Sequence, residues 1–252
     1  MNSDSYKKLD FGRYTVLALL GQGGFGAVYE AFDKELNRIV ALKTMKEKAS
    51  VNCLQRFQRE VAICTRLRHP NVITIFDALA KDESAYIVME RLEAEELGRL
   101  IEMGEVGEKE ALAIVAQIAK AIEYLNREGI LHRDIKPENI MVEESGRAVL
   151  MDFNLGLVDD LTALTATGTV VGTPRYMAPE LWLGRPHSLA SEIYALGLVF
   201  SYMLSGEPPP IYSGRDVQSG IKPIPAPSTI NPKLGKDYDD FIAWVTRADV
   251  QL

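Results

Sequence analysis

The residues best suited to chemistry lie between positions 132 and 139, in the string His-Arg-Asp-Ile-Lys-Pro-Glu-Asn. The carboxylate of Asp134 could accept a proton from a hydroxyl group and orient it for attack. Lys136 supplies positive charge suited to a phosphoryl group in transfer, whose negative charge is spread over its oxygens. Asn139 and a later carboxylate, Asp152, are oxygen ligands suited to Mg²⁺ or Mn²⁺. The string predicts a phosphoryl-transfer site. Taken alone, His132 has a simpler interpretation as a buried structural histidine.

A glycine-rich segment near the start fits the pattern G-x-G-x-x-G-x-V. Glycines let backbone amides approach phosphate oxygens without a side chain in the way. The residues after it read as a strand, so we expect a hairpin over a nucleotide rather than a dinucleotide-binding turn, which would open a helix. A glycine-rich turn without a ligand is the alternative. The residues in question are Gly21, Gln22, Gly23, Gly24, Phe25, Gly26 and Val28.

Lys43 and Glu60 form a second candidate pair. Lys43 lies in the apolar run Val-Ala-Leu-Lys, and Glu60 lies beside the apolar face of a helix predicted over residues 53–67. An ion pair between them would direct the ammonium group at the phosphates of a nucleotide. Taken singly, a surface lysine and a solvated glutamate are the simpler interpretations.

The elements that must position these groups fall into two parts. Apolar and polar alternation predicts strands over residues 14–20, 27–32, 39–45, 72–76 and 85–90. Beyond Arg91 the pattern becomes helical, at residues 97–101, 109–127, 188–204 and 238–245, with short strands at 140–142 and 149–151. A long loop is expected over residues 152–180 and an irregular, proline-rich stretch over 207–232. The prediction is a small β-rich lobe, a hinge at residues 90–92 and a larger helical lobe.

Composition narrows the functional class. The chain has 252 residues, 47% of them apolar, and a net charge of −7, which argues against nucleic-acid binding through a general basic surface. Its two cysteines, Cys53 and Cys64, share one predicted helix and favour a reducing compartment. The polar start has no signal peptide, and the longest apolar stretch, residues 193–204, is too short to cross a bilayer. We expect a cytoplasmic protein, or the cytosolic part of a longer membrane-anchored one.

In this order and at these spacings, the motifs resemble the protein kinase superfamily, and in particular the bacterial eukaryotic-type serine/threonine kinases. The resemblance runs from about residue 14 to about residue 244 and includes Asp-Phe-Asn from Asp152 and Ala-Pro-Glu ending at Glu180. It implies an α+β bilobal protein-kinase fold, with a small antiparallel sheet lobe over residues 14–90 and a larger, mainly helical lobe over 93–252. It also implies ATP and Mg²⁺ as cofactors and serine or threonine in protein substrates.

The resemblance assigns roles to matching positions. Asp134 matches the catalytic base, Lys43 and Glu60 match the ion pair of the small lobe, and Asn139 and Asp152 match the metal ligands. The positions that match the adenine pocket are the gatekeeper Met89, the hinge from Glu90 to Leu92, and the flanking Val28, Ala41 and Met141.

Regulation and substrate class also follow from the resemblance. Lys136 and Thr173 match the serine/threonine class, and Arg133 before the catalytic aspartate marks kinases controlled by activation-loop phosphorylation. Thr165 and Thr167 lie where bacterial relatives autophosphorylate, and a phosphate there could pair with Arg133. A homodimer would serve such autophosphorylation. A threonine-rich loop without a switch is the alternative.

Three positions depart from the family pattern. Asn154 replaces a glycine, and Glu192 replaces an aspartate that anchors the catalytic-loop backbone, a contact we expect to survive. Glu180 has no arginine after the last predicted helix, so we expect either a truncated C-terminal end or another compensating cation. These departures motivate a second interpretation, a pseudokinase that acts as a nucleotide-binding scaffold. A small-molecule phosphotransferase is a third, against which Lys136 and Thr173 argue.

Overall fold

The computed structural model describes residues 10–23, 26–45, 61, 64–81, 84–152, 174–212, 216 and 223–247. These residues fall into two compact units, one up to Glu93 and the other from Ala94 onward. The first is built on an antiparallel sheet and the second mainly on helices, which confirms the predicted α+β class. The lobe boundaries drawn from the sequence, residues 14–90 and 93–252, stay a prediction.

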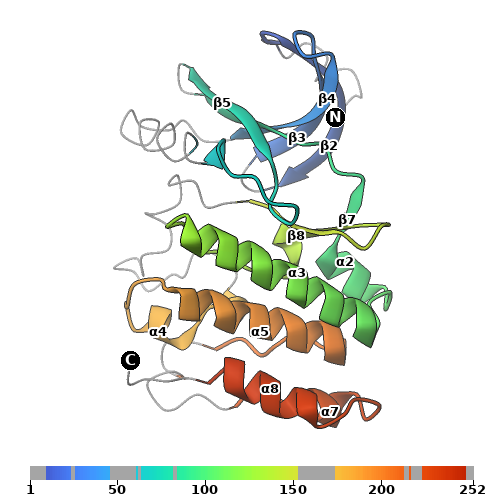
Figure 1. Ribbon diagram of the computed structural model, residues 1–252, viewed down its shortest axis with the longest axis vertical. Coiled ribbons are helices and arrows are strands. Elements are labelled where there is room, and N and C mark those ends of the chain that lie inside the picture. The colour runs from blue at the N-terminus through green and yellow to red at the C-terminus, as the bar shows by residue number, and fades with distance from the viewer. Residues whose placement is uncertain are drawn as a thin grey trace. The chain divides into compact units, whose positions relative to one another are not determined.

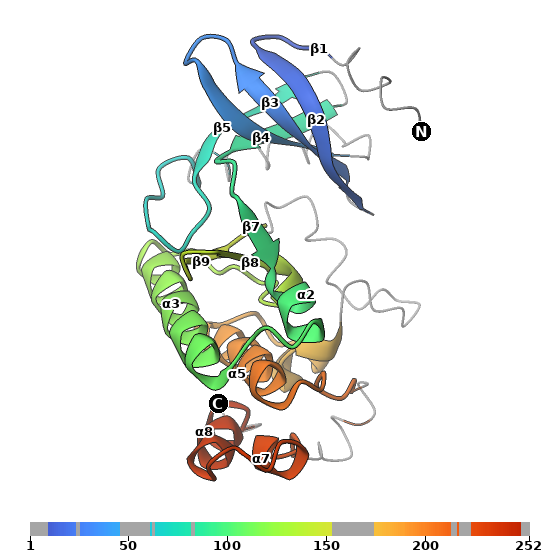
Figure 2. The ribbon, with the colours of Figure 1, turned by 90° about the vertical axis from the view of Figure 1, so that its right-hand side faces the viewer.

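The first unit is a six-stranded sheet in the order β1-β2-β3-β4-β6-β5, in which all neighbours are antiparallel (Figures 1 and 2). Its strands are β1 (Asp10–Phe11), β2 (Tyr14–Gly23), β3 (Gly26–Asp33), β4 (Arg38–Met45), β5 (Ile75–Lys81) and β6 (Ser84–Met89). The strand expected over residues 72–76 was placed wrongly. β5 (Ile75–Lys81) includes Asp77, where its pairing with β6 shifts register, and the Tyr14 hydroxyl donates to the Asp77 carboxylate at 3.2 Å.

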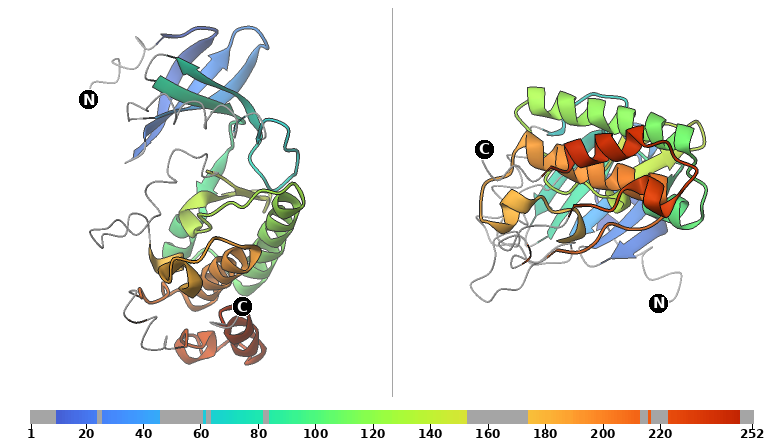
Figure 3. Two further views of the ribbon diagram at one scale, coloured as in Figure 1. Left: turned by 90° about the vertical axis from the view of Figure 1, so that its left-hand side faces the viewer. Right: turned by 90° about the horizontal axis from the view of Figure 1, so that it is seen from below.

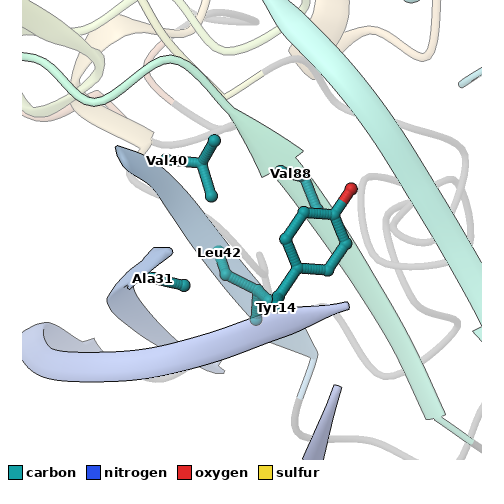
Figure 4. Packing of buried hydrophobic residues seen from close by; sticks show 5 residues of the cluster. All are labelled: Tyr14, Ala31, Val40, Leu42 and Val88. Atoms are coloured by element: carbon teal, nitrogen blue, oxygen red, sulfur yellow. The ribbon is translucent and has the colours of Figure 1, made fainter. Parts of the chain in front are cut away.

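The core of this unit lies on one face of the sheet. Five buried side chains converge there from four strands (Figure 4): Tyr14, Ala31, Val40, Leu42 and Val88. Strand residues alternate between the two faces, so the neighbours of Val40 and Leu42 in β4, Ala41 and Lys43, belong to the opposite face. The alternation that directs Val40 and Leu42 into this cluster therefore directs Ala41 and Lys43 away from it.

The second unit combines a small sheet with stacked helices. Its strands β7 (Ala94–Glu96), β8 (Ile140–Glu143) and β9 (Ala148–Leu150) pair in the order β7-β8-β9. Helix α3 packs on α5, and α5 packs on α8, as Figures 1 and 3 show. The helices are α2 (Leu97–Glu102), α3 (Glu108–Arg127), α4 (Pro179–Trp182), α5 (Leu189–Ser205), α7 (Pro227–Ile230) and α8 (Asp237–Val245), with 3₁₀ turns η2 (Pro137–Asn139) and η3 (Pro174–Tyr176).

Helix α5 is the buried centre of the second unit. It begins at a capping box, in which the Ser188 side chain accepts from the backbone of Ser191 and Ser191 returns the bond. It ends at Gly206, whose φ of 74° suits glycine as a left-handed cap. The prediction of a helix over residues 188–204 is confirmed. The stretch 207–232 was expected to be irregular, yet Pro227 starts the short helix α7, because proline is well suited to the first turn of a helix.

Within the described part of the chain, no helix combines the length and the apolar character needed to cross a membrane.

Candidate active site

One face of the first sheet carries four of the residues predicted to bind the nucleotide. Strand register places Val28 directly opposite Lys43, and Ala41 directly opposite Met89. Residues opposite each other in a sheet share a face, and so do residues two apart along a strand. Val28, Ala41, Lys43 and Met89 therefore lie on the face that points away from the core cluster. We call this set the open sheet face.

The glycine motif forms the end of the β2–β3 hairpin. Gly21 lies opposite Val28, Gln22 opposite Ala27, and Gly23 opposite Gly26. Gly26 has a φ of 153°, a conformation that residues with a Cβ rarely adopt. A Cβ added at Gly21 or Gly23 would meet nothing within 4 Å. The space over these glycines is open, as the approach of a phosphate group would require.

In the second unit, a hairpin and one 3₁₀ turn bring the catalytic-loop residues together. β8 and β9 pair Ile140 with Leu150, and Met151 N–H donates to the Asn139 carbonyl at 2.8 Å, just before this ladder. Asp152 follows Met151 directly. The residues singled out as metal ligands, thirteen apart in sequence, thus come from adjacent strand ends. Met141 lies in β8, half-buried and opposite Val149.

The carboxylate of Asp134 is held on one side. Its Oδ2 accepts hydrogen bonds from Lys136 Nζ at 2.7 Å and from Asn139 Nδ2 at 2.8 Å. The Asn139 amide also donates to the Asp134 carbonyl at 2.7 Å. The Asp134 side chain remains 43% exposed, so it is accessible to a substrate. One carboxylate oxygen is thereby oriented by two neighbours, and no contact to the other is found among the described residues.

The buried side chain of His132 contacts the backbone on both sides of the site, as a neutral imidazole. It is fully buried; its Nε2 lies 2.6 Å from the Met151 carbonyl, and its Nδ1 lies 3.3 Å from Asp134 N–H. Only the tautomer that carries its proton on Nε2 satisfies both contacts. Burial lowers the pKa of His132 below its usual value, although the Met151 carbonyl opposes the shift. The simpler interpretation, a structural histidine, holds for this residue.

Arg133 in the loop and Asp152 after β9 have left-handed backbones, with φ values of 69° and 54°. For a bulky residue such as arginine this conformation is strained, and surrounding contacts must hold it. Glu192 provides one, because its Oε1 accepts from Arg133 N–H at 2.9 Å. The expected anchoring contact is therefore confirmed. Glu192 is 1% exposed, and burial raises the pKa of its carboxyl group despite the backbone hydrogen bonds from Arg133 and His132.

The carboxylate of Glu180 accepts a hydrogen bond from the Ser191 hydroxyl at 2.6 Å, at the first turn of α5. A neutral donor from the capping box thus contacts this group, where the sequence had suggested a cation. Burial lowers the pKa of His187. The charge of Arg133 lowers it further, whereas Glu180 and Asp134 oppose the shift. Sequence patterns did not indicate either Ser191 or His187.

The open sheet face also holds an ion pair that the sequence patterns did not reveal. Glu30 of β3 lies opposite Ala41, and its carboxylate contacts Arg91 Nε at 3.0 Å. Glu90, the residue before Arg91, donates its N–H to the Thr74 carbonyl at 2.9 Å. The alternation of β3 could have predicted that Glu30 shares a face with Val28. No local pattern links Glu30 to Arg91, which lies 61 positions later.

Several predicted site residues lie outside the described part of the chain. They are Gly24, Phe25, Glu60, Asn154, Thr165, Thr167 and Thr173.

The residues proposed for the metal fit a hard cation. Because both N–H groups of the Asn139 amide are directed at Asp134, its oxygen remains as the ligand atom, and Asp152 follows the residue whose N–H donates to the Asn139 carbonyl. The described residues hold no cluster of three or more histidine, cysteine, aspartate or glutamate side chains that could bind a metal ion. Mg²⁺ commonly takes one or two protein ligands and completes its shell with phosphate oxygens and water, so this sparse set suits it.

Comparison with known proteins agrees with this geometry. Residues 14–250 match the family model of the protein kinase domain. Serine/threonine-protein kinase PknD of Mycobacterium tuberculosis (strain ATCC 25618 / H37Rv) is 39% identical over 242 residues, which cover 92% of this chain and 36% of that protein. Serine/threonine-protein kinase PrkC of Bacillus subtilis (strain 168) is 35% identical over 246 residues, which cover 94% of this chain and 38% of that protein.

Among solved structures, the crystal structure of the Mycobacterium tuberculosis PknI kinase domain matches with a TM-score of 0.77 and 27% sequence identity, covering 96% of this chain and 91% of that one. The chain spans less than half the length of the curated relatives named above. The fold, the family model and these relatives agree. The chain belongs to the protein kinase family, as a kinase domain of the bacterial eukaryotic-type serine/threonine class.

Proposed function

We propose that this chain transfers the γ-phosphoryl group of ATP to serine or threonine hydroxyl groups of protein substrates. The observation that carries the proposal is the arrangement at Asp134, where Lys136 and Asn139 hold one carboxylate oxygen while the side chain stays accessible. Such a carboxylate can accept and orient a hydroxyl group in line with a phosphorus atom. The named kinases among its relatives support the same activity.

Each group of residues has a distinct task in this mechanism. The open sheet face takes the adenine and directs Lys43 at the phosphates. Asp134 receives the proton of the attacking hydroxyl. Lys136, 16% exposed, supplies positive charge as the phosphoryl group moves. Lys136 also favours serine and threonine over tyrosine as acceptors, as the family resemblance implies.

Asn139 and Asp152 would hold Mg²⁺, with Mn²⁺ as a substitute. The cation, when bound, neutralises charge on the phosphate oxygens. The protein's own part is to keep two oxygen ligands at adjacent strand ends, through the Met151–Asn139 hydrogen bond.

The regulatory part of the proposal concerns Thr165 and Thr167. Their phosphorylation within a transient homodimer would place negative charge in reach of Arg133. Arg133 is exposed at its side chain, as such a role requires.

The test is incubation of the chain with Mg²⁺, γ-labelled ATP and a serine- and threonine-rich protein substrate. Asp134→Asn keeps the size of the side chain and removes its basicity. We expect it to lower transfer by about 10²- to 10⁴-fold. Glu144→Gln, an exposed acid in the β8–β9 turn, is the matched control and should leave transfer unchanged. Mass spectrometry of the parent should locate label on Thr165 or Thr167.

Three outcomes would contradict the proposal. ATP binding without transfer in the parent would identify a nucleotide-binding scaffold. Label that appears only on small molecules would identify a different phosphotransferase. Equal transfer by the parent and Asp134→Asn would remove Asp134 from the mechanism. Nothing in the contacts of the described residues favours the scaffold, because Glu192 keeps the anchoring role of the usual aspartate.

A further inference from the structure

A single guanidinium group connects the open sheet face to the segment predicted as the adenine hinge. Arg91 Nε contacts Glu30 Oε2 at 3.0 Å, and Arg91 Nη1 donates to the Leu92 carbonyl. Arg91 itself lies in the hinge, between Glu90 and Leu92. One side chain thus ties β3 to a backbone oxygen of the segment that would contact the base.

Glu30 lies among residues proposed to contact the nucleotide. It follows Val28 by two positions in β3 and lies opposite Ala41 of β4. Ala31 belongs to the core cluster and Tyr29 packs against it, so Glu30 between them belongs to the other face. An uncompensated carboxylate here would oppose an anionic ligand, and the pairing with Arg91 removes that charge.

The other end of the hinge is also fixed by hydrogen bonds. Glu90 N–H donates to the Thr74 carbonyl at 2.9 Å, and Thr74 N–H donates to Glu90 Oε1 at 2.8 Å. The segment is therefore held to the sheet on one side by Thr74 and on the other by Glu30. Holding a binding segment in one conformation before the ligand arrives reduces the entropy lost on binding.

The position of this ion pair distinguishes it from ordinary surface pairs. Both side chains are 28% exposed, and the partners are 61 residues apart, whereas Arg99 and Glu95 form a neighbouring pair that is 65% and 45% exposed. Exposed pairs within one short segment contribute little to stability. A half-buried pair that joins a strand to a connecting segment restrains the backbone.

We propose that the Glu30–Arg91 ion pair is a positioning device for the nucleotide base: it holds residues 90–92 in the conformation that receives adenine and neutralises the Glu30 carboxylate on the open sheet face. This proposal rests on the proposed kinase function. Arg91 acts through the hinge backbone and through Glu30, so its loss should weaken nucleotide binding and leave the chemical step intact.

The test compares Arg91→Ala, Glu30→Ala and the charge exchange Glu30→Arg with Arg91→Glu. In the active chain, we expect Arg91→Ala to raise the KM for ATP about five- to tenfold with kcat at saturating ATP changed less than twofold. Glu30→Ala should have a smaller effect, because it leaves no unpaired carboxylate on the face. The exchanged pair should recover at least half of the loss. Arg99→Ala is the matched control and should change neither constant.

A second measurement separates this proposal from the kinase function. The dissociation constant of Mg²⁺-ATP is measured by calorimetry in the Asp134→Asn background, which does not require transfer. There Arg91→Ala should raise the constant by the same factor. An active parent with unchanged KM in Arg91→Ala overturns the positioning role alone. That role is equally overturned if kcat falls at constant KM, or if the exchanged pair binds no better than the single variants.

Discussion

The open sheet face and the catalytic loop achieve their geometry in different ways. On the sheet face, Val28, Ala41 and Lys43 are placed by strand alternation and by regular register with their neighbours. In the loop, Lys136 and Asn139 hold the Asp134 carboxylate, and Arg133 donates its N–H to Glu192, which is 59 residues away. The sheet face therefore depends on the core behind it, whereas the loop depends on a few buried polar contacts. Mutations should damage the two regions in different ways.

The largest expected effect on stability comes from comparing substitutions on the two faces of β4. Leu42 is fully buried in the core cluster, and Leu42→Ala should lower the free energy of unfolding by about 2–5 kcal/mol. Its neighbour Ala41 belongs to the opposite face but is only 6% exposed, so Ala41→Val should weaken ATP binding and cost less stability, about 1–3 kcal/mol, through overpacking. Chemical denaturation and nucleotide titration under folding conditions provide the two readouts. Equal losses of stability in both variants would contradict the assignment of the faces.

The loop should be most sensitive at its anchor. Glu192→Ala leaves the N–H of Arg133 without its acceptor, which should cost about 1–3 kcal/mol of unfolding free energy and lower kcat. Glu192→Gln keeps an acceptor oxygen and removes the cost of burying a charge, so it should be more stable than the alanine variant.

Denaturation curves and initial rates of Glu192→Ala, Glu192→Gln and Glu192→Asp supply the comparison. If Glu192→Ala retained full kcat, catalysis would not depend on this contact.

A smaller effect tests whether the helix layer behind the loop matters for chemistry. A Cβ at Gly197 in α5 would lie 2.6 Å from Val245 Cγ2 in α8, so Gly197→Ala must shift the Val245 side chain or the helix that carries it. We expect a loss of about 1–2 kcal/mol in unfolding free energy, partly offset by the better helix propensity of alanine. Gly235→Ala is the matched control, because its Cβ would meet nothing within 4 Å. If Gly197→Ala also lowered kcat under conditions in which the protein stays folded, the packing of α5 on α8 would support the loop geometry.

The smallest effect concerns pH. The pKa of His132 is lowered from 6.5 by burial, so the unfolded chain takes up a proton before the folded one as the pH falls. The unfolding free energy should therefore decrease with acidification below pH 6.5, and His187 adds a contribution of the same sign. Glu192 contributes the opposite sign, because its raised pKa makes the folded chain the better proton acceptor.

The readout is the difference in unfolding free energy between the parent and His132→Gln, measured from about pH 7.5 to about pH 5.5. The stability of His132→Gln should fall less steeply across this range. Parallel curves would indicate that His132 keeps an ordinary pKa in the folded state. His187→Gln, measured in parallel, isolates the second histidine.

Much of this protein follows from its sequence alone. The string from His132 to Asn139 and the glycine motif predicted a phosphoryl-transfer site, because these residue types at these spacings serve few other purposes. Alternation in β3 and β4 predicted the strands that carry Val28 and Lys43. Periods of 2 and 3.6 residues are local properties, so they can be read from the chain directly.

Only the tertiary structure decided which distant groups meet. It joined Glu30 to Arg91, Ser191 to Glu180, and Tyr14 to Asp77. None of these contacts leaves a periodic signal, since each links residues that become neighbours only when strands and helices pack. Spacing along the chain reports which face a residue occupies, whereas the identity of its polar partner depends on long-range packing.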